Sequence, residues 1–314
     1  MPQSYPIIRV TVRPKDDANR ESLQRVLNNL TQEDSIMRVD AAAIEGETVI
    51  SGVQELHLQI ICERISREFG IPIDVGDLEV IYLETVRKNA EAEGRYFRQL
   101  GGRAQYGHVK IRLEPLKPGT GYEFIDDIRN DAIPSAFRGS VDLGIQEAMK
   151  GGVVGGHEMV DLRAVLCDGS YHAEDSNEMA FKIAGAIAFK EAARQASPVV
   201  LEPIMSIEVS VPEEYVGAIV GDLSLRRGRI EGLESRSGSQ VISATAPLAN
   251  LIGYSKQLRS IAQSKAAVSM NFAGYEQTPS PGEPGADTAG VVAIKPKKPK
   301  PGSGFAAAQW DDES

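Results

Sequence analysis

Two glycine-bearing loops hold the residues whose types and spacing are best suited to chemistry. QLGGRAQYGH, at 99–108, lies between two expected strands, and DGSYHAEDS, at 168–176, lies between an expected strand and a helix. Arginine pairs with phosphate, aromatic rings stack on bases, and amides and imidazoles bind base edges or 2′-hydroxyl groups. Two ordinary surface hairpins are the alternative. The candidate RNA-binding residues in these loops are Arg103, Gln105, Tyr106, His108, Ser170, Tyr171 and His172.

A third candidate site is the basic cluster in LRRGRIEG, at 225–232. Its arginines, Arg226, Arg227 and Arg229, precede an expected strand near the end of the chain. They could contact phosphates, and a solvated charged surface is the alternative. The whole chain has 34 basic and 44 acidic residues, a net charge of −10. Any contact with nucleic acid must therefore be made through local basic patches.

Nucleotide hydrolysis has no support in the sequence. A phosphate-binding P-loop requires the pattern GxxxxGK[ST], which the chain does not contain. GGVVGGHE, at 151–158, is rich in glycine but has no lysine or hydroxyl at the required places, and it follows an expected helix. It is predicted to be a helix C-terminal stop and turn. We expect no catalytic residues, and no binding of GTP by this chain alone.

A metal site has little support either. His172, Glu174, Asp175 and Glu178 could bind a cation in principle, but no second histidine or cysteine is nearby. His57 lies in an expected helix and is predicted to be structural. The only cysteines, Cys62 and Cys167, suit a reducing cytosol. No apolar run is long enough for a membrane helix, so we expect a cytoplasmic protein without a membrane partner.

An internal repeat indicates the architecture. PIIRVTV at 6–12 is echoed by PIMSIEV at 203–209, and each unit reads strand–helix–strand–strand–helix–strand. This is the ferredoxin-like pattern. Two apolar stripes predict the helices of the first unit: Leu23, Val26, Leu27 and Leu30, then Leu58, Ile61, Cys62, Ile65 and Phe69. In the second unit the last helix is expected at about 248–263.

Between the repeats we expect a different α/β domain. Its strands are predicted at 92–98, 108–113, 122–126 and 160–167, and its helices at 134–149 and 176–196. Asp175 and Glu178 are predicted to form a capping box for the second helix, whose small residues allow close packing. The fold class is α+β with three modules. The expected domains are 1–77, 78–201 and 202–278, followed by a disordered tail rich in Pro, Gly and Lys at 279–314.

Long colinear motifs resemble bacterial elongation factor G. They include GGRAQYGHVKIRLEP, GSYHAEDSNEMAFKIAGAIAFKEA, LEPIMSIEVSVPEEYVGAIVGDLSLRRGRIEG and LIGYSKQLRS, and ISGVQELHLQIICERISREFG looks like its third domain. The resemblance runs from about 6 to 279. It implies two ferredoxin-like domains, III and V, flanking a domain IV like ribosomal protein S5. We expect the family's GTPase and β-barrel domains, which bind GTP and Mg²⁺, to be absent. A separate gene product, a split gene and a fragment all fit this expectation.

The resemblance also implies partners. In the family, domain IV reaches the decoding region of the small ribosomal subunit, and its tip loops contact transfer RNA and messenger RNA during translocation. Those loops correspond to 101–107 and 169–176, and Gln105 and His172 match the tip residues most closely tied to that contact. Domain V lies against large-subunit ribosomal RNA near the stalk base. Ala104 stands where the family usually has glycine, which should stiffen the first loop modestly. A separate chain carrying the GTPase domain is a candidate partner.

Two rival functions remain open at this point. One is a paralogue of elongation factor G that acts in ribosome recycling or ribosomal protection. Tips of different length and composition would be expected in such a protein. The other, of a different class, is an enzyme on a ferredoxin-like scaffold, and the lack of a convergent acid, base, nucleophile or metal set argues against it.

Overall fold

The computed structural model describes residues 6–34, 37–42, 44, 46–100, 103–129, 131–236 and 238–279. These residues form two compact units, 82–204 with 274–279 and 6–81 with 205–273. Three separate sheets run through them, as the three-module prediction requires. No helix in these ranges is both long and apolar enough to cross a membrane. The predicted tail at 279–314 lies outside the described residues except for Pro279.

The first module has the predicted ferredoxin-like order. Its elements are β1 (Ile8–Pro14), α1 (Arg20–Glu33), β2 (Arg38–Ala41), β3 (Thr48–Gly52), α2 (Glu55–Arg67), β4 (Ile73–Val75) and β5 (Glu79–Val80). The sheet order is β2-β3-β1-β4, and β5 also pairs with β1. Alternate residues of β1 are buried, as expected for a strand with one face on a core. The α+β pattern read from this segment is confirmed.

Both predicted helix stripes of this module face the core, with one correction. Leu23, Leu27 and Leu30 of α1 are buried, as are Leu58, Ile61 and Ile65 of α2. Phe69 was predicted to continue the second stripe, but α2 ends at Arg67 and the Phe69 side chain is 41% exposed. The stripe fails there because Gly70, at φ +64°, turns the chain out of the helix.

The last module repeats this order. Its elements are β11 (Pro198–Val211), α5 (Val216–Leu225), β12 (Arg229–Arg236), β13 (Ser239–Pro247), α6 (Tyr254–Ile261) and β14 (Ala267–Gln277). The sheet order is β12-β13-β11-β14. The last helix was expected over about 248–263 and is shorter. A 3-10 turn at Leu248–Asn250 precedes it, and Gly253 at φ +74° separates that turn from α6.

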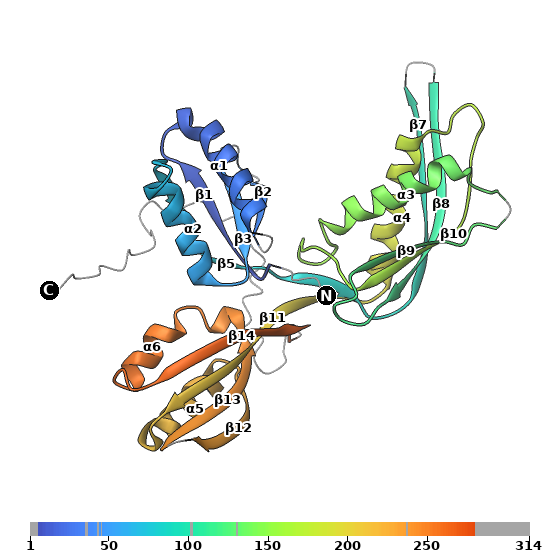
Figure 1. The fold of residues 1–314 in the computed structure, drawn as a ribbon. Coiled ribbons are helices and arrows are strands. Elements are labelled where there is room, and N and C mark those ends of the chain that lie inside the picture. Colours follow the sequence, from blue (N-terminus) through green and yellow to red (C-terminus); the bar gives the residue numbers. More distant parts are fainter. Residues whose placement is uncertain are drawn as a thin grey trace. The chain divides into compact units, whose positions relative to one another are not determined.

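The middle module is a four-stranded sheet with two helices on one face (Figure 1). Its elements are β6 (Leu83–Val86), β7 (Ala90–Leu100), β8 (Arg103–Pro115), β9 (Tyr122–Asp126), α3 (Ser135–Met149), β10 (Leu162–Ser170) and α4 (Glu178–Gln195). The sheet order is β7-β8-β10-β9, and β6 pairs with β11. β9 and β10 run parallel because α3 returns the chain to the same end of the sheet.

Small residues let α3 and α4 pack closely. A Cβ on Gly144 in α3 would overlap the carbonyl oxygen of Lys182 in α4. Ala180, Ala184, Ala188 and Ala192 of α4 are fully buried, so the prediction of close packing by small residues is confirmed. The predicted capping box is wrong. Asn177 is the N-cap residue, and its side chain accepts the N–H of Ala180 at 2.9 Å.

Candidate RNA-contacting site

The first predicted tip loop is largely strand, and the second begins as strand. β7 and β8 stay paired to Leu100 and Arg103, so only 101–102, which lie outside the described residues, remain between them. β10 likewise continues through Ser170. Cross-strand pairing overrides the loop-like composition of these segments, because each added pair satisfies backbone donors and acceptors. The loop expected at 99–108 is therefore wrong over its described residues, and the loop expected at 168–176 is shortened to 171–176.

Hydrogen bonds tie the segment after β10 to β8. The N–H of Tyr106 donates to the carbonyl oxygen of Asp175 at 2.9 Å. The Ser176 hydroxyl donates to the carbonyl oxygen of Tyr106 and accepts the N–H of His172, both at 2.9 Å. One serine therefore closes the second loop and attaches it to the sheet. These bonds also explain why the helix begins after Ser176 rather than at it.

Tyr106 is the centre of the side-chain cluster. Its hydroxyl lies 2.7 Å from Oγ of Ser170, and its ring centroid lies 4.3 Å from that of His172 in an edge-on arrangement at 68°. Tyr106 and Ser170 are half-buried, whereas His172 and Tyr171 are exposed. Tyr106 and Ser170 therefore support the His172 ring, and the rings of Tyr171 and His172 are exposed to solvent.

His108 lies within the sheet surface rather than at its tip. Its side chain is only 16% exposed, with Nδ1 2.9 Å from Oγ of Ser170 and Nε2 3.4 Å from Oε2 of Glu93. The Arg95 guanidinium, and then the His108 ring, hold the pKa of Glu93 below its ordinary value. These contacts orient Ser170. Direct RNA contact by His108 stays a prediction.

Gln105 lies on the opposite face of β8 from Tyr106, because side chains alternate along a strand. It lines a surface hollow of about 580 Å³ with residues of α3 and of the start of α4: Ser140, Leu143, Asn177, Glu178, Met179 and Lys182. The tip therefore presents hydrogen-bonding groups on two faces, with Gln105 on the helix side and the Tyr106–His172 pair on the other.

Two positions in the first segment have a packing explanation. A Cβ on Gly107 would lie 2.6 Å from the carbonyl oxygen of Ala180, so this glycine permits α4 to lie directly on β8. Gly107 therefore lies in a strand rather than in the predicted loop. Ala104 is paired with Gln99 inside the hairpin, where the conformational freedom of glycine is not needed. The Arg103 side chain lies outside the described residues, and its phosphate contact stays a prediction.

Arg226 of the last module is held inside the fold. Its guanidinium donates to Oδ2 of Asp222 at 2.9 Å, to the carbonyl oxygen of Asn250 and to the side chain of Gln257. It also lies over the Tyr254 ring, 5.0 Å from the centroid, and burial raises the pKa of Tyr254 to about 12. With its side chain only 18% exposed, Arg226 has a structural position that the basic cluster did not predict.

Its neighbours differ in exposure. Arg227 is half-buried at φ +62°, at the turn after α5, and Arg229 is exposed at the start of β12. Both engage in interactions within the chain. Their ribosome contacts stay predictions. Of the three arginines in this cluster, Arg229 is the most exposed.

The glycine-rich segment at 151–158 binds an anion that belongs to the chain itself. The Glu84 carboxylate is fully buried and accepts the N–H groups of Val153, Val154, Gly155 and His157 at 2.7–3.1 Å. Successive backbone N–H groups of this kind also form phosphate-binding nests. Here Glu84 occupies them, so the turn predicted after the helix has a second role that glycine composition alone did not reveal.

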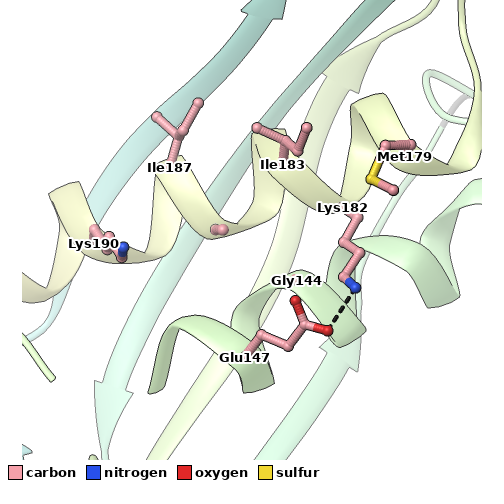
Figure 2. Close-up of a pocket in the computed structure, with 8 residues that line it drawn as sticks. Gly144, Glu147, Met179, Lys182, Ile183, Ile187 and Lys190 are labelled. Atoms are coloured by element: carbon pink, nitrogen blue, oxygen red, sulfur yellow. Dashed lines mark ion pairs between the residues drawn. The ribbon is translucent and has the colours of Figure 1, made fainter. Parts of the chain in front are cut away.

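A second hollow lies between α3 and α4 (Figure 2). It measures about 320 Å³ and is lined by Met179, Ile183 and Ile187 of α4. Lys182 of α4 forms an ion pair with Glu147 of α3 across it. Lys190 also lines it, and the lining includes no histidine, cysteine or hydroxyl group.

His57 pairs with an acidic side chain of the first module. Nε2 of His57 lies 2.8 Å from Oδ2 of Asp34, which confirms its structural role. Throughout the described ranges, no group of three or more histidine, cysteine, aspartate or glutamate residues could hold a metal ion.

Comparison with known proteins identifies the three modules. Residues 3–77 match the family model for elongation factor G domain III, 78–197 that for domain IV, and 199–283 that for the elongation factor G C-terminus. The crystal structure of ttk003000868 from Thermus thermophilus is 36% identical, with a TM-score of 0.66. The match covers 87% of this chain and 41% of that one.

These matches follow the chain in the same order as the three sheets. They define the class: a translation-factor chain built from α+β modules. The chain belongs to the elongation factor G family and comprises counterparts of its domains III, IV and V.

Proposed function

We propose that this chain binds the ribosome in the cytoplasm and that its middle module contacts RNA in the decoding region to promote movement of transfer RNA and messenger RNA. The observation that carries this proposal is the tip cluster, in which Ser176 and Tyr106 hold the exposed His172 in the segment after β10, beside the β7–β8 hairpin. An exposed imidazole on a rigid support can hydrogen-bond to a base edge or a 2′-hydroxyl with little ordering cost.

The remaining partners follow from the other modules. Large-subunit ribosomal RNA would lie against the last module, with Arg229 as the most exposed of its three candidate arginines. GTP and Mg²⁺ would be bound by a GTPase domain, in the same factor or in a separate chain. Glu84 already fills the backbone nest at 153–157, whose N–H groups would otherwise be available to an anion such as phosphate.

The test is His172→Ala in the 314-residue chain, with binding to ribosomes followed by chemical probing of the decoding-region RNA. The parent chain should protect that RNA, and the variant should need up to about tenfold more protein for equal protection, as loss of one net hydrogen bond of about 1–1.5 kcal/mol implies. Because His172 is exposed, the melting temperature should hardly change.

Glu174→Ala is the matched control, since it removes an exposed carboxylate from the same loop. It should not weaken protection, because a carboxylate repels phosphate. If His172→Ala unfolds the module, and protection falls only in proportion to the folded protein lost, His172 is structural. If the parent chain gives no protection in the decoding region, the proposed function is wrong.

A further inference from the structure

Phe97 is the most exposed aromatic residue in the part of the chain that the structure describes, with 66% of its surface accessible. It lies in β7, near the distal end of the β7–β8 hairpin. A large apolar ring in this position gains little from burial, so it contributes little to the stability of the fold. Tyr171, the other exposed aromatic residue of the tip, is 46% exposed and lies in the second loop.

The strand register places Phe97 beside the tip cluster. Phe97 is directly opposite Tyr106, and directly opposite residues of an antiparallel pair carry their side chains on the same face. Tyr106 in turn contacts the ring of His172. Three rings therefore follow one another across β7, β8 and the segment after β10, on the face that carries no helix.

The polar groups around this row favour RNA over an apolar partner. Arg95 lies two residues before Phe97 on the same face, with its side chain 70% exposed and ion-paired to Glu93 at 3.0 Å. The row also carries the Tyr106 hydroxyl and the His172 imidazole. Aromatic rings among cationic and hydrogen-bonding groups are the usual composition of a platform for unpaired bases.

We infer that Phe97 is a stacking residue for an unpaired RNA base at the tip. This inference rests on the proposed function, because it takes RNA as the ligand of the same face. Stacking on phenylalanine tolerates any base, since every base has a π-face. The two paired strands hold the Phe97 backbone before the base arrives, so little conformational entropy is lost on binding.

The test uses the 314-residue chain and a short single-stranded RNA that carries one 2-aminopurine, whose fluorescence falls when the base stacks. The parent chain should quench it with saturation. Phe97→Ala should weaken that binding by roughly fivefold or more, in line with the loss of one stacked base. Phe97→Tyr keeps the ring and should keep the parent affinity. Phe69→Ala removes a 41%-exposed phenylalanine of the first module and should have no effect.

Phe97→Leu separates stacking from apolar docking. It keeps apolar bulk without a π-face, and should lose quenching as Phe97→Ala does. Parent-like quenching by Phe97→Leu or Phe97→Ala overturns the inference, as does the absence of saturable quenching by the parent chain. Ribosome protection keeps the two proposals distinguishable. If His172→Ala weakens protection of the decoding-region RNA but Phe97→Ala does not, the proposed function stands and the stacking role fails.

Discussion

At the residue scale, the Arg226 guanidinium makes its hydrogen bonds within the last module. Replacing it with alanine should lower the free energy of unfolding of the last module by about 2 kcal/mol, since hydrogen bonds to charged groups are lost and Asp222 keeps a largely buried carboxylate. Hydrogen exchange of peptides covering α5 and α6 would measure this, with faster exchange expected in both helices.

Two variants control the Arg226 experiment. Arg226→Lys keeps the positive charge but lacks the planar guanidinium that donates to three acceptors. It should therefore also accelerate hydrogen exchange in α5 and α6. Arg229→Ala removes an exposed arginine and should change stability by no more than about 0.5 kcal/mol. Unchanged exchange in Arg226→Ala, together with weaker ribosome binding, would instead assign Arg226 to phosphate contact.

At the element scale, Glu84 fixes the segment between α3 and β10. Glu84→Gln replaces the carboxylate that accepts four backbone N–H groups with a neutral amide. The NH₂ of that amide would face backbone N–H donors in place of an acceptor oxygen. We expect a loss of about 2–3 kcal/mol, as for other buried charge-assisted hydrogen bonds. Faster hydrogen exchange at 151–158 would show it. Glu158→Gln, at an exposed neighbouring carboxylate, is the control and should leave exchange unchanged.

At the scale of the whole molecule, the net charge of −10 limits contact with RNA to a few positive sites. Ribosome affinity should therefore fall steeply with salt, because each phosphate contact releases counterions. Arg229→Ala should reduce the slope of log affinity against log salt by about 1 if Arg229 contacts a phosphate. Sedimentation with ribosomes across a salt series would measure this. Arg67→Ala, at an exposed arginine of the first module, is the control, and salt-independent binding would contradict the prediction.

Local patterns in the sequence determined the element order. Buried Leu23, Leu27 and Leu30 recur at the spacing of one helix face, and β1 alternates with period two, so each signal needs only its own neighbours. The end of α3 at Met149 was predicted for the same reason. The domain limits at 77, 201 and 278 stay predictions. The roles of the candidate RNA-binding residues also stay predictions, because composition does not reveal a partner.

Contacts distant in sequence decided the rest. Ser176 meets Tyr106 across 70 positions, and Glu84 meets Gly155 across 71, so no local window contains either interaction. Such contacts extend the β7–β8 hairpin beyond its predicted ends and hold Arg226 inside the last module. They also make α4 begin at Glu178 rather than at the predicted position 176. The sequence by itself determined which residues are candidates for RNA contact. Only the tertiary structure decided which are presented and which are held, because exposure depends on what the rest of the chain packs against each side chain.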